Sequence, residues 1–287
     1  MAGINSLAPA PLYDALKSSG MPILISQPAS SPDWNAPNAV SYNGGGTIVA
    51  ASIAAVSKKM GAKSASMVSS DVAAAKATVD ATGAALLKQG IDMKKVYVTL
   101  PYTDGLPLVL QANASSVDLL PVQLSTSCLP FLKAMKQLGI SPSKVVTSSS
   151  CASDTLIAQD NSLFQGAKVY LFNDDALMGK GQSPELDLFI DNYPKYSGMS
   201  QAKGVPTYAA TGWATVLSLV NALKGKPDSV LDNRASILTA LRGFKGPAVM
   251  GPDVLNCGGY PQWGPTMCTE EGVIAQVQGN AYIKYRM

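Results

Sequence analysis

The chain has 287 residues, of which 47% are hydrophobic and 14% charged, a composition that indicates a well-packed globular protein, long enough for two lobes, and excludes general disorder. The 22 basic and 19 acidic residues give a formal net charge of +3 without a charged block, so no feature favours nucleic acid as a partner. No apolar run reaches the ~18 residues that a membrane-spanning helix needs.

Hydrophobic periodicity and glycine stops predict strands and helices that alternate with a period near thirty residues. In chain order we expect a helix over 9–19, a strand over 21–26, a helix over 47–60, a strand over 64–68, a helix over 71–89, strands over 95–99 and 117–123, a helix over 128–138, strands over 145–147 and 168–172, helices over 184–196, 208–223 and 233–241, and a β-hairpin over 272–285. This order is typical of βαβ units and predicts a parallel sheet that ends in antiparallel strands.

Four cysteines form an even set with three possible pairings: Cys128, Cys151, Cys257 and Cys268. Turn-forming residues separate Cys257 from Cys268, so a disulfide between these two is geometrically easy, which leaves Cys128 to pair with Cys151. Two disulfides indicate an oxidising compartment. A zinc site with four thiolates is the first alternative, although the close cysteine pairs that it usually shows are missing; four free buried thiols are the second.

Several residues needed for common enzyme chemistry are missing. Histidine is absent, which excludes Ser-His and Cys-His nucleophile pairs and removes the commonest zinc ligand. The nearest approach to a phosphate-binding loop is Gly179-Lys180, but Asp174 stands where its first glycine belongs. We therefore expect no enzyme, no cofactor and no metal, with an α/β enzyme kept as an alternative.

Several segments resemble branched-chain amino-acid binding proteins and related solute receptors of ABC importers. The segments that carry the resemblance are GMPILIS at 20–26, PASSP at 28–32, GAK at 61–63, FQGAKVY at 164–170, YAATGW at 208–213 and LRGFKGP at 241–247. The resemblance implies a two-lobed type I periplasmic-binding-protein fold in which parallel sheets are flanked by helices. Members normally have about three βα units before the segment that matches residues 3–6, so an incomplete N-terminal lobe is expected.

The resemblance also implies the domain division and the function. We expect residues 1–42 and 174–250 to form the first lobe, and 43–173 and 251–287 the second. Hinges are expected near residues 42–45, 173–176 and 250–253. The implied protein is an extracytoplasmic monomer, periplasmic or lipid-anchored, that delivers a small ligand to a membrane permease. A ligand-sensing regulatory domain with the same fold is the alternative.

The site is expected where loops follow the carboxyl ends of strands, because loop amides and helix N-termini offer hydrogen-bond donors there. The family's ligand loop matches Pro28, Ala29 and Ser30, whose hydroxyl and amides would hold a ligand carboxylate; alternatively, Ser30 caps a turn. A second polar contact region matches Ser6. The opposite wall is expected to include Asp71, Ala73, Ser125, Thr126 and Ser149.

Two positions bear on the ligand. Ala73 stands where the amino-acid receptors often place a tyrosine, and no acidic residue clearly replaces the group that holds an α-ammonium; Asp71 and Asp154 are the nearest candidates. We therefore expect a roomier, less charged pocket for an aromatic or lipid-like carboxylate. For Ser127 and Ser153, by contrast, the capping of a helix is the expected role.

Overall fold

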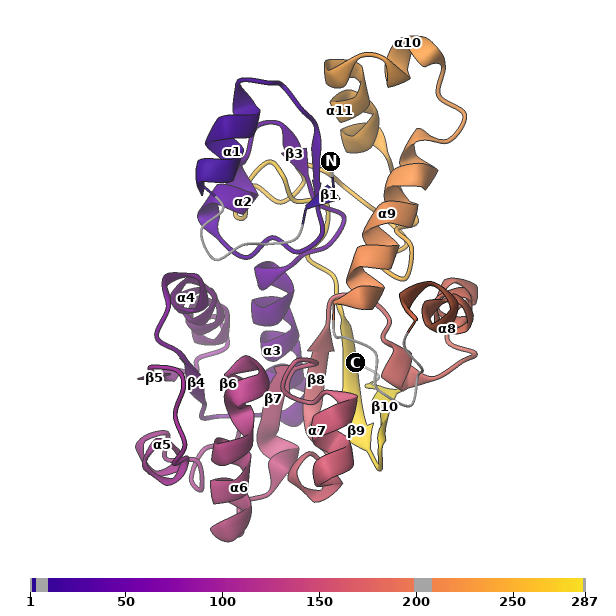
Figure 1. Ribbon diagram of the computed structural model, residues 1–287. Helices are drawn as coiled ribbons and strands as arrows, with labels where there is room; N and C mark the ends of the chain where they lie inside the picture. Colours follow the sequence, from indigo (N-terminus) through magenta and orange to yellow (C-terminus); the bar gives the residue numbers. More distant parts are fainter. Residues whose placement is uncertain (1, 4–9, 199–207, 286–287) are drawn as a thin grey trace.

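The computed structural model describes residues 2–3, 10–198 and 208–285. These residues form two halves, each with its own sheet (Figure 1). The smaller sheet has three parallel strands in the order β1 (Ala2–Gly3), β2 (Ile23–Ile25) and β3 (Ala39–Val40). The larger sheet has seven strands in the order β10-β9-β8-β7-β6-β4-β5.

The larger sheet contains the predicted parallel strands and the predicted hairpin. Its strands are β4 (Ser66–Ser70), β5 (Lys94–Val98), β6 (Leu120–Gln123), β7 (Val145–Ser148) and β8 (Lys168–Leu171), all parallel, with β9 (Val273–Gln278) and β10 (Ala281–Lys284) antiparallel. The register places Val68 opposite Val122 and Val122 opposite Thr147. The alternation predicted from the sequence is thus confirmed.

Helices cover both faces of the larger sheet. Successive strand residues point to opposite sides, and apolar side chains on both sides are buried against helices. Met67 packs with α3 (Gly46–Met60) and α4 (Ala73–Leu87) on one face, whereas its neighbour Val68 packs with the cluster on the other. Val145 and Val146 divide in the same way. The second face carries α5 (Leu106–Gln111), α6 (Leu129–Gln137), α7 (Asp154–Gln159) and α8 (Pro184–Ser197). Short 3₁₀ turns connect these elements: η1 (Ser125–Cys128), η2 (Pro142–Lys144), η3 (Asn161–Leu163) and η4 (Ala176–Met178).

The smaller sheet is also enclosed on both faces. Ile23 and Ile25 pack toward α1 (Ala10–Lys17) and α2 (Ser31–Asn35). Leu24 points the other way, into a cluster with Leu241 of α11 (Arg234–Gly243) and residues of α9 (Ala209–Leu223). The short α10 (Asp228–Leu231) connects these two helices. Each half is therefore a sheet between two helical layers.

Two segments pack with the half other than the one expected from the sequence. Leu186 and Phe189 of α8 lie in the cluster of the larger sheet, because η4, which contacts β10, also contacts that helix. Leu255 and Cys268 lie in the cluster of the smaller sheet, where Ser41 forms a β-bridge to Met267. The lobe boundaries themselves stay a prediction.

Both expected disulfides are present, which confirms the pairing inferred from spacing. Cys128 bonds Cys151 and joins the start of α6 to the loop after β7. Cys257 bonds Cys268 and closes the turn-rich segment beside the smaller sheet. No free cysteine remains in the chain.

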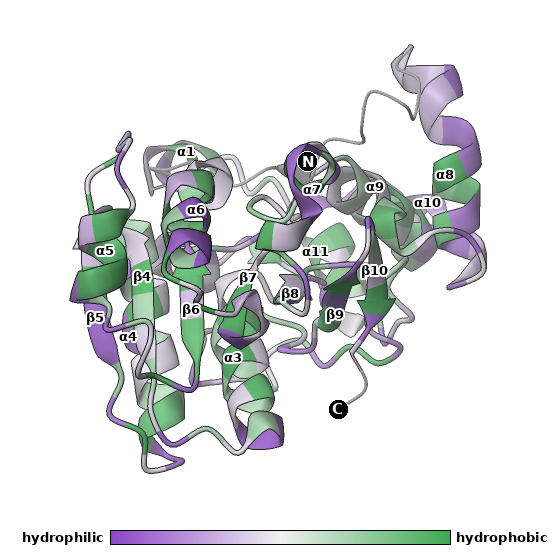
Figure 2. Cartoon of the chain, turned by 90° about the horizontal axis from the view of Figure 1, so that it is seen from below, coloured by the Kyte–Doolittle hydropathy of each residue, from purple (hydrophilic) through white to green (hydrophobic). Residues whose placement is uncertain are grey.

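The outer strand β5 of the larger sheet carries charged side chains. Lys94 and Lys95 are exposed on β5, whose polar colour is visible at the sheet edge in Figure 2. Lys95 pairs with Asp80 of α4 at 2.6 Å. Lysines on an edge strand oppose pairing with a further chain. Of the helices in the described part of the chain, none is long and apolar enough to cross a membrane.

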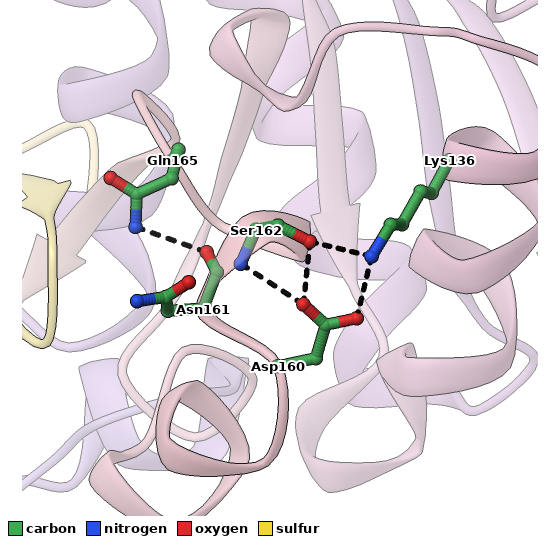
Figure 3. A network of polar contacts seen from close by, with 5 residues as sticks. All are labelled: Lys136, Asp160, Asn161, Ser162 and Gln165. Atoms are coloured by element: carbon green, nitrogen blue, oxygen red, sulfur yellow. Dashed lines mark hydrogen bonds and ion pairs between the residues drawn. The ribbon is translucent and has the colours of Figure 1, made fainter.

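A polar network anchors α6 near the amino ends of the strands (Figure 3). Lys136 Nζ lies 2.8 Å from Asp160 Oδ2 and donates to Ser162 Oγ at 2.7 Å. The Lys136 ammonium and the Ser162 donors lower the pKa of Asp160. Gln165 Nε2 donates to the carbonyl of Asn161 at 3.0 Å, which holds the turn before β8. These contacts lie at the amino ends of the strands, on the side of the sheet opposite their carboxyl ends.

Candidate ligand-binding site

A cavity of about 200 Å³ lies between the two halves. The smaller half contributes Gln27 and Ala29 from the loop after β2. The larger half contributes the rest of the lining: Gly46, Val49, Ser70, Val72, Ala74, Ala75, Thr78, Leu100, Gln123, Leu124, Ser125, Ser148, Ser150, Tyr170, Phe172 and, at the start of α9, Tyr208. A molecule in this cavity would contact both halves.

The wall formed by the larger half lies at the carboxyl edge of its sheet. Ser70 ends β4, Gln123 ends β6, Ser148 ends β7, and Phe172 follows β8 directly. Neighbouring parallel strands end at the same edge, which brings these side chains together from segments that lie far apart in the sequence. The cavity therefore lies at the edge of the sheet where the strand-end rule expects a ligand site.

The segments that join the two halves lie directly beside the cavity. Asn43 Nδ2 donates to the carbonyl of Phe172 at 3.3 Å and to Asn173 Oδ1 at 3.1 Å, and Asp174 N donates to the carbonyl of Met250 at 2.9 Å. All three predicted hinge regions thus meet. Gly45 has φ +51°, and a Cβ there would lie 1.8 Å from the Pro28 carbonyl oxygen, so glycine is required by close packing rather than by mobility.

The donors of the loop after β2 are already bonded within the protein. Buried Asp33 accepts through Oδ2 from Ala29 N at 3.0 Å, from Ser30 N at 2.9 Å and from Ser30 Oγ at 2.8 Å. Its Oδ1 accepts from the hydroxyl of Tyr13 at 2.6 Å. Ser30 has a capping role, as in the alternative given above, but it caps the helix α2 and not a turn. A ligand carboxylate could bind these amides only if it displaced the Asp33 carboxylate or lay beside it, where the two negative charges repel each other.

The N-terminus of α4 offers donors instead. Val72, Ala74 and Ala75 line the cavity, and the N-cap Val72 has no side chain that caps the helix. Within the described part of the chain, the amides of Ala73, Ala74 and Ala75 have no hydrogen-bond acceptor. The neighbouring α3 differs, because its first amide, that of Gly46, donates to the Pro28 carbonyl at 2.7 Å. Unpaired amides at a helix start attract negative charge.

The rest of the lining is aromatic and neutral. Tyr170 and Phe172 make an edge-to-face pair with ring centroids 6.2 Å apart, and burial raises the pKa of the Tyr170 phenol. The hydroxyl groups of Ser150 and Tyr208 lie 3.4 Å apart. None of the eighteen lining residues named above carries a charge. The cavity combines an apolar wall with hydroxyl, amide and backbone donors.

The sequence model of the periplasmic binding protein family matches residues 1–262. The chain belongs to this family. Similar solved structures include a fatty acid ABC transporter substrate-binding protein from Thermomonospora curvata, with a TM-score of 0.78, 13% identity and coverage of 99% of this chain and 73% of that one. A solute-binding protein of an ABC transporter from Rhodopseudomonas palustris in complex with p-hydroxybenzoic acid has a TM-score of 0.76, 16% identity and coverage of 100% and 76%. A leucine-binding protein from Thermotoga maritima has a TM-score of 0.74, 13% identity and coverage of 99% and 78%. No curated protein matches.

The residues predicted for the site of this periplasmic binding protein are placed unevenly. Ala29 and Ser125 line the cavity, and Ser125 adopts a positive φ of +49°. Pro28 contributes its carbonyl to the Gly46 amide, beside the cavity. Exposed Thr126 follows in η1, and Ala73 begins α4.

The remaining predicted residues either do not line this cavity or lie outside the described residues. Asp71 is exposed and pairs with Lys76 of α4 rather than facing the cavity. Ser149 is buried and lines a different cavity, while its neighbours Ser148 and Ser150 line this one. Ser6 lies outside the described residues. Within residues 2–3, 10–198 and 208–285, no group of three His, Cys, Asp or Glu side chains is placed to hold a metal ion.

Sequence reasoning missed the aromatic part of the site in this periplasmic binding protein. Tyr170 and Phe172 stand at the end of a predicted strand, so the strand-end rule applied to β8 would have found them. Tyr208 begins a predicted helix and is brought in only by the packing of α9. Of the two predicted caps, Ser153 does cap α7, accepting from Leu156 N at 3.4 Å, but Ser127 lies inside η1 and Cys128 is the N-cap of α6.

Proposed function

We propose that this chain is the solute-binding receptor of an ABC importer and that it binds a small carboxylate with an apolar body between its two halves. The observation that carries the proposal is the cavity itself, which is walled by the loop after β2 on one side and by four strand ends on the other. Such a ligand stabilises the closed arrangement because it contacts both walls. The chain makes or breaks no bond in the ligand.

The chemistry of the lining supports the ligand class. The carboxylate is held at the amides of α4, where Ala73, Ala74 and Ala75 have donors to offer. The apolar body lies against Tyr170 and Phe172. A zwitterion such as leucine fits less well, because its ammonium group finds no carboxylate in the lining. The related structures described as a fatty acid transporter component and as a complex with p-hydroxybenzoic acid agree with this class.

The packing supports a lobe division that differs from the one predicted. We place residues 10–42 and the segment 219–268 in the first lobe, and residues 46–198 with 273–285 in the second, with α9 passing from one to the other. The two disulfides suit an extracytoplasmic compartment. In this role the partner is a membrane permease that recognises the closed form.

The experiment is calorimetric titration of benzoate, 4-hydroxybenzoate, octanoate and leucine into the wild type and into the Ala73→Pro variant. Proline suits this position because it is the first residue of α4 and the preceding Val72 has an extended backbone, with φ −130° and ψ 151°. The substitution removes one amide donor, so we expect the affinity for carboxylates to fall by about tenfold.

Ala73→Gly is the matched control, because it alters the same side chain and keeps the amide. It is expected to bind within about threefold of the wild type. The proposal fails if none of the acids binds, or if leucine binds at micromolar concentration and the larger acids do not.

A further inference from the structure

A second and larger cavity, of about 400 Å³, lies within the larger half. It is built by the loops after β7 and β8, by α8 and by β10, and its lining is Ser149, Ser153, Asp154, Asp175, Ala176, Leu177, Gly179, Lys180, Ile190 and Tyr282. It shares no lining residue with the cavity between the halves. Its shape therefore does not depend on how the two halves sit relative to each other.

The walls of the second cavity combine apolar surface with negative charge. Leu177, Ile190 and Tyr282 supply the apolar part, and the Tyr282 hydroxyl is turned to the Ala152 carbonyl at 2.7 Å. Asp154 and Asp175 supply two carboxylates. A volume of this size is ordinary for a small-molecule site.

The cation in the lining is already paired. Lys180 forms an ion pair with Asp191 of α8, on the exposed side of the cavity. The nearby Lys284 is oriented to Asp174, with 3.4 Å between Nζ and Oδ1. Neither ammonium group makes an ion pair with Asp175. One oxygen of Asp175 accepts from Leu177 N at 2.9 Å, which holds the carboxyl group at the start of η4.

The surroundings of Asp175 disfavour its charge. Burial, together with the negative charge of Asp154, raises the pKa of Asp175 to about 6, and the Leu177 amide opposes this only in part. The phenol of Tyr282, whose pKa burial raises well above its usual value, remains neutral. Among the described residues neither Lys180 nor Lys284 pairs with Asp175, so an ammonium group in the cavity would supply a counter-charge.

We infer that this cavity is a second binding site, separate from the one between the halves, and that it takes a compact primary amine with an aromatic or aliphatic body. The ammonium group lies against Asp175, with Asp154 adding to the negative potential. The apolar body lies against Leu177, Ile190 and Tyr282. The protein can hold this amine in both the open and the closed arrangement of its halves, because the site is complete within one half.

The test is calorimetric titration of the whole chain with tyramine at pH 7, with 4-ethylphenol as the neutral analogue. We expect tyramine to bind and 4-ethylphenol to bind at least tenfold more weakly. Asp175→Asn keeps the shape and removes the charge, and should weaken tyramine binding by at least tenfold. Asp232→Asn, which removes an exposed carboxylate in the other half, is the matched control and should have no effect.

Four further measurements distinguish this site from the proposed receptor site and from damage to the fold. Leu177→Trp, which fills the cavity, should abolish tyramine binding, whereas Ala73→Pro should leave it unchanged. Tyramine affinity should fall by about tenfold between pH 7 and pH 5, where Asp175 is mostly protonated and the amine is still charged. Circular dichroism checks that each variant is folded. The inference is overturned if tyramine does not bind, or if folded Asp175→Asn and Leu177→Trp bind it as the wild type does.

Discussion

Asn43 and Asn173 hydrogen-bond to each other through their side chains, with 3.1 Å between Nδ2 of Asn43 and Oδ1 of Asn173. The two residues belong to two different segments that join the halves, and both are buried. Oδ1 of Asn43 also accepts from Gly45 N at 2.7 Å, and its Nδ2 donates to the Phe172 carbonyl. One side chain thus ties the start of α3 to the end of β8.

Replacement of Asn43 by alanine should therefore destabilise the protein. It leaves buried donors and acceptors without partners, and we expect the free energy of unfolding to fall by about 2 kcal/mol. Urea denaturation followed by circular dichroism measures this. The control is Asn35→Ala, which removes an exposed amide that donates only within α2, and should change the free energy by less than about 0.5 kcal/mol. Equal effects of the two substitutions would contradict the role given to Asn43.

Of the neighbours Gly45 and Gly46, only Gly46 has room for a side chain. Gly45→Ala places a Cβ against the Pro28 carbonyl at a positive φ, and should reduce the free energy of unfolding by at least ~2 kcal/mol. At Gly46 the nearest atom to a new Cβ is Thr78 Oγ1 at 3.5 Å, so Gly46→Ala should stay within ~1 kcal/mol of the wild type. Thermal unfolding of the two variants gives the comparison. A tolerated Gly45→Ala would show that the loop after β2 does not approach α3 as described.

The disulfide between Cys128 and Cys151 should stabilise the protein mainly by restricting its unfolded chain. Replacing both cysteines by alanine is expected to lower the free energy of unfolding by about 3 kcal/mol. Urea denaturation of the double variant measures the loss. Thiol titration of unfolded, unreduced wild type should detect no reactive thiol; four reactive thiols would contradict both disulfides.

Asp175 makes stability depend on pH in a direction opposite to that of most carboxylates. Its pKa is about 6 in the folded protein against 3.8 as the ordinary value, so the folded state holds the proton more tightly. The contribution of this group to stability is complete below pH 3.8 and is lost as the pH rises through 6. Between pH 4 and pH 7 the loss amounts to roughly 2–3 kcal/mol.

The Asp175→Asn variant isolates this contribution. We expect its stability relative to the wild type to increase by roughly 2–3 kcal/mol between pH 4 and pH 7, as measured by urea denaturation at both values. If the difference between variant and wild type is the same at both pH values, the carboxyl of Asp175 does not titrate as described.

The fold was largely predictable because its main elements have strong local signals. Short apolar runs, as at Met67 and Val68, mark strands of the larger half, and glycine stops such as Gly61 and Gly139 mark its helix ends. The short elements were missed: α2, α5 and α7 have five or six residues, too few for helical periodicity to appear. The placement of Leu255 and Cys268 beside the smaller sheet depends on long-range packing that no local pattern contains.

The strand-end rule leads to the edge of the sheet where the cavity lies, but among the predicted residues that the structure describes only Ala29 and Ser125 line that cavity. Strand ends follow from the order of the elements, which is why Ser125 and Ser149 could be predicted near the carboxyl ends of strands, where each lines a cavity. The backbone of this short segment decides which cavity each serine faces, and no sequence pattern contains that information. Ser149 lines the cavity within the larger half, whereas Ser148 and Ser150 line the cavity between the halves. The occupation of the Ala29 and Ser30 amides by Asp33 is likewise a matter of three-dimensional contact.

The distance between the two halves, measured with and without ligand, shows whether the halves close around the ligand. All four native cysteines are in disulfides, so cysteines introduced as Asp14→Cys in α1 and Lys133→Cys in α6 provide exposed, specific labelling positions, one on each half. Energy transfer between dyes at these positions should increase when the acid that binds in calorimetry is added, and Ala73→Pro should shift that increase to higher concentration. Stoichiometric binding with no change in energy transfer would show that the halves do not close around the ligand.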